Sequence, residues 1–337
     1  MKRILFIGLA TFGAAFTSLC LTVLAQDYQP ALTEYGQPDL SGVWNFSSNT
    51  PLERPERFGE TEFLRDVDTS ATNTRRTSSS PRSGPNTTGV IGAYNSYWND
   101  RAQLQQNERT SLIVHPTNGR IPPVNDGVHV QPGGDITTDV DFGESRPVRY
   151  THGGIGRTGP EDRGLSERCL VFVSGPPLLT GYYNNHIQII QNTDHVVLMV
   201  EMGWDARIVS LQDKPHIDSV IQQWSGDSRG YWDGNSLVVE TRNFSDKVGS
   251  LSLRGIAYGT ARDRLLIERF TPMAPGVLEY QFTVDDPTTF TDKIVGVSSM
   301  TRVDDEIFEF SCHSGNYAMT GILRAGRVMD ADAARAD

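Results

Sequence analysis

Cysteine is scarce in this chain: there are three in 337 residues, and one of them, Cys20, lies in the first 25. Basic residues are also few, since 30 Lys and Arg stand against 41 Asp and Glu, a formal net charge of −11. With no basic block, nucleic acid and anionic membrane surfaces are disfavoured as main partners. Charged residues at 21% and aromatics at 9% argue against general disorder.

Several catalytic signatures are missing as well. The chain has no Gly-x-Gly-x-x-Gly loop after a strand, no Walker loop and no His-Glu-x-x-His motif. We do not interpret the segment GDSRG at 226–230 as the nucleophile elbow of a serine hydrolase. We therefore expect neither an organic cofactor nor a serine nucleophile.

The first segment has the features of an export signal. Lys2 and Arg3 precede an apolar run that ends near Leu24, and Ala25 stands before a cleavage position at Gln26. We expect a signal peptide over residues 1–25 and a periplasmic or secreted mature protein with no membrane partner. Removing two basic residues takes the net charge from −11 to about −13. The alternative is an uncleaved membrane anchor.

Two cysteines remain after cleavage, Cys169 and Cys312. In an oxidising compartment such a pair favours one disulfide bond. The chain-entropy model gives a bridge across so long a loop an upper bound of about 5 kcal/mol. The alternatives are two buried thiols or one reactive thiol.

Residues 26–166 form a loop-rich N-terminal portion that we expect to wrap the core. Within it, 68–89 is rich in Ser, Thr, Arg, Gly and Pro and predicts a loop. Residues 93–108 predict one short exposed helix, and 117–166 is a second long excursion.

From residue 167 to about 325 the chain consists of short runs rich in β-branched and aromatic residues, separated by turn signals. The expected strands lie at 187–191, 195–202, 219–224, 236–244, 264–271, 278–286, 294–303 and 306–313. Alternation over 278–284 places Leu278, Tyr280, Phe282 and Val284 on one face. We predict a mainly β fold, an antiparallel meander closing into a lipocalin-like barrel or sandwich, followed by a disordered tail at 326–337.

Six segments carry a resemblance to a known family, and it covers most of the mature chain. They are RTSLIVHPTNGRIPP (109–123), YYNNHIQIIQ (182–191), WSGDSRGYWDGNSLVVET (224–241), ERF (268–270), DDPTTFTD (285–292) and CHSGNY (312–317). They resemble a largely uncharacterised family of secreted bacterial proteins, which implies export and a β fold but no substrate. GVWNF at 42–46 more weakly resembles the first strand of lipocalin-like barrels.

Titratable side chains inside the expected strands are the candidates for chemistry, because an unpaired polar group inside a barrel is costly. His186 shares a strand face with Gln188, Glu201 interrupts an apolar strand, and one of Glu268 and Arg269 must point inward. The candidate catalytic residues are His186, His313, Glu201, Tyr182 and Arg207. The candidate substrate-binding residues are Asn185, Asp205, Asp227, Arg229, Trp232 and Arg269. Each also has a structural interpretation, as a turn former, a strand end, an ion pair or a polar face.

These residues indicate an enzyme that uses acid–base chemistry without a cofactor, as a lyase, isomerase or hydrolase, on a small and largely neutral molecule held in a barrel pocket. The alternatives are a periplasmic binding or carrier protein without turnover and an envelope interaction protein with a solidly packed barrel. A metal also stays open, since His186, Glu201, His313 and His216 are possible ligands, although no pair has tight ligand spacing.

Overall fold

The computed structural model describes residues 28–66, 109–132, 157–180, 184–203, 205–253 and 256–336. Four expectations lie outside these residues: the signal peptide over 1–25, the loop over 68–89, the helix over 93–108 and the candidate Tyr182.

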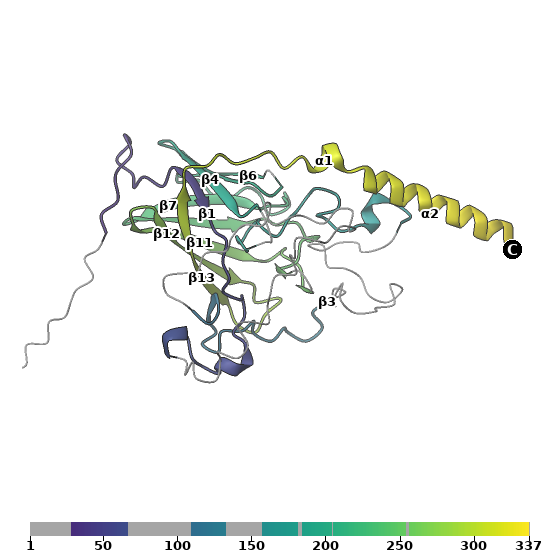
Figure 1. Ribbon diagram of the computed structural model, residues 1–337, viewed down its shortest axis with the longest axis horizontal. Helices are drawn as coiled ribbons and strands as arrows, with labels where there is room; N and C mark the ends of the chain where they lie inside the picture. Colours follow the sequence, from purple (N-terminus) through teal and green to yellow (C-terminus); the bar gives the residue numbers. More distant parts are fainter. Residues whose placement is uncertain are drawn as a thin grey trace, which may run out of the picture.

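Nine strands of the described chain form a closed barrel (Figure 1). Around the wall they follow the order β1 (Gly42–Asn45), β4 (His186–Gln191), β5 (His195–Val200), β6 (Ala206–Ser210), β7 (Asp227–Asp233), β8 (Ser236–Arg242), β11 (Leu265–Ala274), β12 (Val277–Asp285) and β13 (Ile294–Val303). The pairing is antiparallel except between β6 and β7, which are parallel and meet at Ser210 and Arg229. The predicted β barrel is therefore confirmed, with nine strands where lipocalins have eight.

The barrel closes because β1 lies between the two ends of the meander. Val43 stands opposite Val303 of β13 on one side and opposite Gln188 of β4 on the other. A strand from the N-terminal portion is thus part of the wall, and it lies in the segment GVWNF that resembles the first strand of lipocalin-like barrels, although we expected the portion as a whole to wrap the core. A further short strand, β2 (Ile113–His115), pairs with β13.

Alternation along β12 decides which side chains fill the barrel. Leu278, Tyr280, Phe282 and Val284 are buried, as the sequence predicted, while the residues between them are partly exposed. Phe282 stands opposite Gly296 of β13, where a Cβ would clash with the phenyl ring. Glycine at this position lets the ring lie flat across the neighbouring strand.

Segment 157–180 reaches into the barrel from outside the wall. Leu165 and Leu178 are buried in the same apolar core as the strands, and the Leu178 N–H donates to the hydroxyl of Tyr280 at 2.9 Å. The segment contains one turn of 3-10 helix, η4 (Pro160–Asp162). Similar turns, η1 (Glu56–Phe58) and η2 (Leu64–Asp66), lie near the start of the described chain.

A smaller sheet of three strands packs on the apolar core of the barrel without pairing with its strands. It consists of β3 (Val130–Pro132), β10 (Ile256–Tyr258) and β9 (Leu251–Ser252), in that order. The predicted strand over 219–224 is wrong: this stretch is irregular and makes a single bridge, between Gln223 and Phe244.

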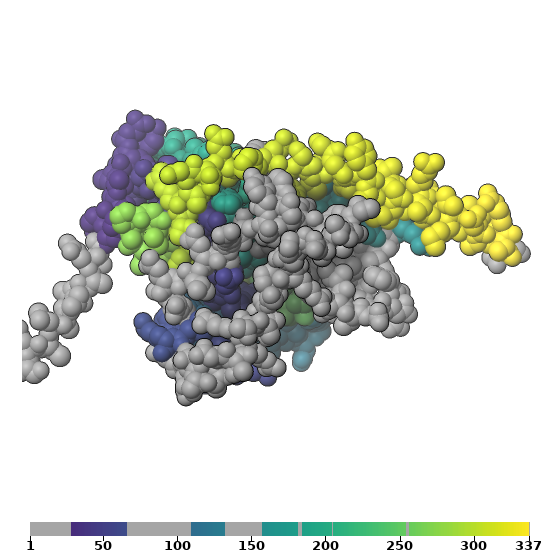
Figure 2. Space-filling view, in the orientation of Figure 1, coloured from purple at the N-terminus to yellow at the C-terminus, as the bar shows by residue number. Residues whose placement is uncertain are grey.

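The predicted strand over 306–313 is also wrong. Residues 304–311 form an irregular segment, here called the strap, which leads into α1 (Cys312–Gly315) and α2 (Tyr317–Ala336). α2 projects away from the barrel (Figures 1 and 2), with Gly326 as its buried residue. It occupies residues where we expected a disordered tail. Within the described ranges, none of the helices has both the length and the apolar character needed to cross a membrane.

The predicted disulfide between Cys169 and Cys312 is confirmed. The two sulfur atoms are 1.96 Å apart and the Cα atoms 5.8 Å apart. Asn316 strengthens the same junction, since its side-chain amide donates to the carbonyl of Glu167 at 2.7 Å. The bridge therefore ties the end of the strap to the segment that enters the barrel.

Candidate functional site

His186 and Glu201 are direct cross-strand neighbours. His186 begins β4, Glu201 follows β5, and the pairing of Ile187 with Val200 places them opposite each other. The Glu201 N–H donates to the His186 carbonyl at 2.9 Å. Because paired residues in adjacent strands share a sheet face, their side chains meet, with His186 Nδ1 at 2.9 Å from Glu201 Oε2.

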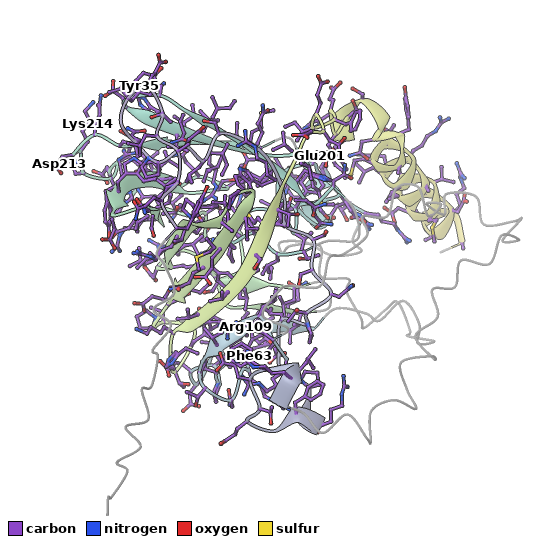
Figure 3. The ribbon with its side chains drawn as sticks, turned by 60° about the vertical axis from the view of Figure 1, so that its left-hand side comes forward. Tyr35, Phe63, Arg109, Glu201, Asp213 and Lys214 are labelled. Atoms are coloured by element: carbon purple, nitrogen blue, oxygen red, sulfur yellow. A yellow bond between two sulfur atoms is a disulfide. The ribbon has the colours of Figure 1, made fainter. Side chains whose placement is uncertain are left out.

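This pair lies on the outer face of the barrel wall. Ile187 and Val200 are buried in the barrel core, so the preceding and following residues point the other way. The side chains are nevertheless sheltered, with 19% of His186 and 5% of Glu201 exposed. Figure 3 shows Glu201 close to the start of the C-terminal helical part.

Glu201 is held from more than one side. Its Oε1 accepts the backbone N–H of Phe308 in the strap at 3.1 Å. Burial alone would raise the pKa of this carboxyl, but hydrogen bonds from His186, Phe308 and Asn184 outweigh it and hold the pKa below its usual value. Glu201 is therefore a carboxylate at neutral pH.

The strap is fixed over this pair by three kinds of contact. Besides the bond to Glu201, Phe310 packs edge-on against Phe172, with ring centroids 5.1 Å apart. The disulfide then anchors the chain two residues later, at Cys312. These contacts explain why 306–313 is not a strand: its backbone follows Glu201 and the disulfide instead of a neighbouring strand.

A second carboxylate, Glu268, is paired inside the barrel. Arg207 on β6 and Glu268 on β11 form a double ion pair, with N–O distances of 2.5 and 3.1 Å. Tyr280 donates its hydroxyl to Glu268 Oε1 at 2.7 Å. All three side chains are buried, and the expectation that one of Glu268 and Arg269 points inward is confirmed.

The charges of Arg207 and Glu268 compensate each other inside the barrel. Burial opposes the charge of Arg207, but Glu268 outweighs burial and raises the pKa of Arg207. Burial, together with Glu268, raises the pKa of Tyr280 well above its usual value. The charge of Arg207 is thus compensated by Glu268. Arg207 does not contact His186, which points to the opposite face of the wall.

Asp227 organises a surface loop together with two basic residues. Its Oδ2 is 2.7 Å from His216 Nδ1, and its Oδ1 is 2.9 Å from a guanidinium nitrogen of Arg229. Arg229 also donates to the carbonyl of Pro215 at 3.3 Å. These contacts tie the irregular stretch after β6 to the start of β7, as the structural interpretation of Asp227 requires.

The remaining candidates are dispersed. Asp205 accepts a hydrogen bond from Ser225, and Arg269 pairs with Asp233 at the surface, 2.8 Å apart. Trp232 packs against the barrel core with a buried indole nitrogen. Asn185 is buried, and its carbonyl accepts the N–H of Phe46 at 2.9 Å.

His313 does not join the outer pair. It lies exposed on α1, directly after the disulfide, and it is not among the groups that bind Glu201. The strand expected at 306–313, which would have placed His313 at its end, does not form.

The segment GDSRG has the letters of a nucleophile elbow but not its geometry. Ser228 lies within β7, not at a turn from a strand into a helix. Its hydroxyl is buried and pairs with Thr241 of β8 at 2.9 Å. Among the residues that the structure describes, no group of three or more His, Cys, Asp or Glu side chains is arranged to hold a metal ion.

Sequence reasoning missed the pairing of His216 with Asp227, and it missed Arg264. Arg264 precedes β11 in the turn-rich sequence ARDR, where an arginine is ordinarily exposed, yet it is 3% exposed. No sequence signal marks it. No protein-family model, curated protein or solved structure matches this chain.

Proposed function

We propose that this chain is an exported enzyme in which His186 and Glu201 carry out acid–base catalysis, without a cofactor, on a small and largely neutral organic molecule. The observation that carries the proposal is the 2.9 Å contact between the imidazole and a carboxylate that a backbone N–H also holds. A histidine oriented by a buried carboxylate is the usual arrangement of a general base.

In this arrangement Glu201 sets the tautomer of His186. An ionised carboxylate accepts hydrogen bonds but cannot donate one. In the neutral imidazole, Nδ1 therefore carries the hydrogen and donates it to Glu201. The basic lone pair is then on Nε2. A proton taken from the substrate by Nε2 makes an imidazolium that Glu201 stabilises, and its return to another substrate atom completes an isomerisation or an elimination.

The proposed substrate lies against the outer face of the wall, below the strap, rather than within the barrel. The barrel interior of the described chain is filled by large aromatic side chains, among them Phe270, Tyr280 and Phe282. This differs from the pocket position that we expected from the sequence, and a filled interior is also what the envelope interaction protein would have; the contact of His186 with Glu201 is what favours an enzyme.

Export is supported by the disulfide. A bond between Cys169 and Cys312 persists in oxidising compartments and is rare in the cytosol. It also holds the strap over Glu201, so an oxidising location and an ordered site go together in this proposal.

The test is to incubate the purified protein with an extract of its own culture and to follow consumed and produced compounds by mass spectrometry. His186→Gln is compared with His216→Gln, a matched control, because His216 also pairs with a carboxylate and is 20% exposed. We expect a compound that disappears with the wild-type protein and with His216→Gln but persists with His186→Gln.

Two results would contradict the proposal. Equal conversion by wild type and His186→Gln would remove His186 from the chemistry. A compound that copurifies with the protein and is never converted would instead indicate a binding protein without turnover.

A further inference from the structure

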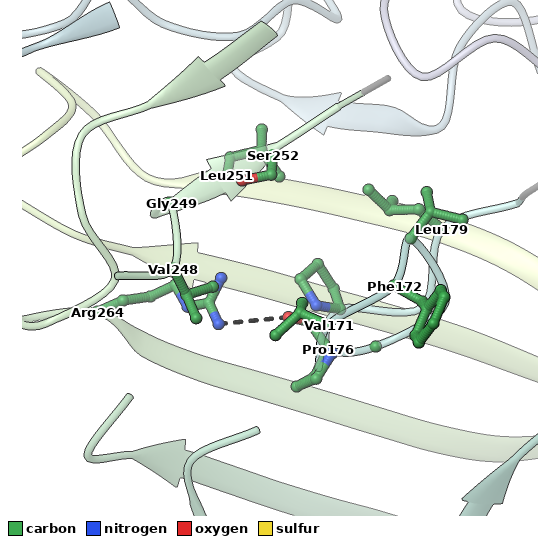
Figure 4. Close-up of a pocket in the computed structure, with 12 residues that line it drawn as sticks. Val171, Phe172, Pro176, Leu179, Val248, Gly249, Leu251, Ser252 and Arg264 are labelled. Carbon is green, nitrogen blue, oxygen red and sulfur yellow. Dashed lines mark hydrogen bonds between the residues drawn. The ribbon is translucent and has the colours of Figure 1, made fainter. Parts of the chain in front are cut away.

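A second site lies between the segment that enters the barrel and the loop before β9. It is a small pocket lined on one side by Val171, Phe172 and Leu179, and on the other by Val248 and Leu251 (Figure 4). The cavity volume is about 20 Å³. This volume suits a small head group rather than a whole ligand.

Arg264 provides the charge in this pocket. It is 3% exposed, and its guanidinium lies over the ring of Phe244 at 3.8 Å. Two of its N–H groups donate to backbone carbonyls, to Ser250 at 2.7 Å and to Pro176 at 3.3 Å. Its Nε is buried and has no hydrogen-bond partner within the described chain.

No carboxylate within the described ranges forms an ion pair with Arg264, which is unusual for a buried cation. Asp286 and Glu268 act on it from farther away. Burial lowers the pKa of Arg264 to about 10, whereas at Arg207 the same effect of burial is outweighed by the paired Glu268, so that the pKa of Arg207 is raised. At neutral pH Arg264 is still a cation.

Ser252 adds a second donor at the same place. Its side chain lines the pocket, and its Oγ is buried without a partner among the described residues. The lining residues therefore contribute two buried donors without partners among the described residues, a guanidinium N–H and a hydroxyl, among apolar side chains. Such a set favours a ligand that offers acceptor oxygens and a short apolar body.

We infer that this pocket binds the carboxylate of a small aliphatic monocarboxylic acid, with Arg264 and Ser252 as its donors. A single negative charge fits better than a dianion such as phosphate, because Asp286 and Glu268 already lie within electrostatic range. The apolar walls then contact the alkyl part of the acid. The site does not depend on the proposed chemistry of His186.

The experiment is a titration of the full chain with sodium propionate, followed by the melting temperature and by the line width of carboxyl-labelled propionate in NMR. Sodium chloride at equal ionic strength and the neutral isostere propionamide are run in parallel. We expect saturable binding of propionate with Kd on the order of 1 mM. We expect at least about tenfold weaker binding of propionamide, because hydrogen bonds to a charged group are stronger.

Gly249→Ala blocks the pocket without touching Arg264. The glycine has ordinary backbone angles, and an added Cβ would meet the Ser252 hydroxyl. Gly321→Ala on α2, where a Cβ meets nothing, is the matched control. We expect Gly249→Ala and Arg264→Gln to abolish propionate binding, and Gly321→Ala and His186→Gln to retain it.

Equal binding of propionate and propionamide, equal binding by Gly249→Ala and the wild-type protein, or no binding at all would each overturn the inference. If Arg264→Gln fails to fold, the comparison of Gly249→Ala with Gly321→Ala still decides the question.

Discussion

Two carboxylates flank the wall of this barrel, and they are used in opposite ways. Glu268 points inward, is fully buried and is satisfied by Arg207 and Tyr280. Glu201 points outward and pairs with His186, whose ring remains 19% exposed. The inner carboxylate faces a permanent cation, while the outer one faces an imidazole, a group that can both accept and donate a proton. Burial and pairing thus neutralise the charges inside the wall, whereas outside it they hold an imidazole and a carboxylate in the arrangement that the proposed acid–base chemistry requires.

The strongest test of this contrast is to break the inner pair. Glu268→Gln leaves Arg207 buried without its counter-charge, and we expect a loss of about 3–5 kcal/mol in unfolding free energy, measured by urea denaturation. Arg207→Met combined with Glu268→Met removes both charges, and we expect it to cost less than Glu268→Gln alone. A loss below about 1 kcal/mol for Glu268→Gln would show that the pair is not structural.

The next largest effect comes from the disulfide. Replacing Cys169 and Cys312 by serine should lower the unfolding free energy by about 2–4 kcal/mol, since the bridge closes a loop of 143 residues. It should also raise hydrogen exchange at Phe308, because the strap loses its anchor. Unchanged exchange at Phe308 in the double serine variant would mean that Glu201 alone holds the strap.

Acid should remove the stabilising contribution of the outer pair as Glu201 becomes protonated. The folded pKa of Glu201 is lowered, so its stabilising contribution is present above the ordinary glutamate pKa and is lost as pH falls through the folded value. We expect Glu201→Gln to cost about 1–3 kcal/mol at pH 7 and almost nothing once the pH is well below the folded pKa of Glu201. A cost that is the same at both pH values would contradict the ionised state of Glu201.

The smallest effect is expected at the surface pair of Arg269 with Asp233. Both partners are partly exposed, at 31% and 61%, so Arg269→Ala should change the unfolding free energy by at most about 1 kcal/mol. Urea denaturation beside Glu268→Gln gives the direct comparison, because Glu268 and Arg269 are adjacent and point to opposite faces. A loss of unfolding free energy as large as that of Glu268→Gln would contradict the view that the inner ion pair stabilises the fold more than the surface ion pair does.

Local pattern predicted much of the barrel. Period-two alternation placed Tyr280 and Phe282 inward. The export signal, together with the two cysteines that remain after cleavage, predicted the bond between Cys169 and Cys312. These features depend on neighbouring residues or on a pair with few alternatives. The sequence marks both His186 and Glu201 as candidates but does not predict that they pair, because register across a hairpin depends on the turn between the strands.

Other features are set by contacts between distant parts of the chain. The strap over 304–311 has the composition of a strand, but Glu201, Phe172 and Cys169 determine its path. β1 closes the barrel, although it precedes its partner β4 by more than 140 residues in the sequence. Arg264 lies in a turn-rich stretch, and only the packing of Pro176 and Phe244 around it reveals that it is buried.

One measurement tests the central claim most directly: the pKa of Glu201, from carboxyl ¹³C chemical shifts followed over pH in the wild-type protein and in His186→Gln. The wild-type pKa should lie below that of an ordinary glutamate. It should rise in His186→Gln, because burial then acts against fewer stabilising hydrogen bonds. A wild-type pKa at or above the ordinary value, or a pKa unaffected by His186→Gln, would show that the outer carboxylate does not work with His186.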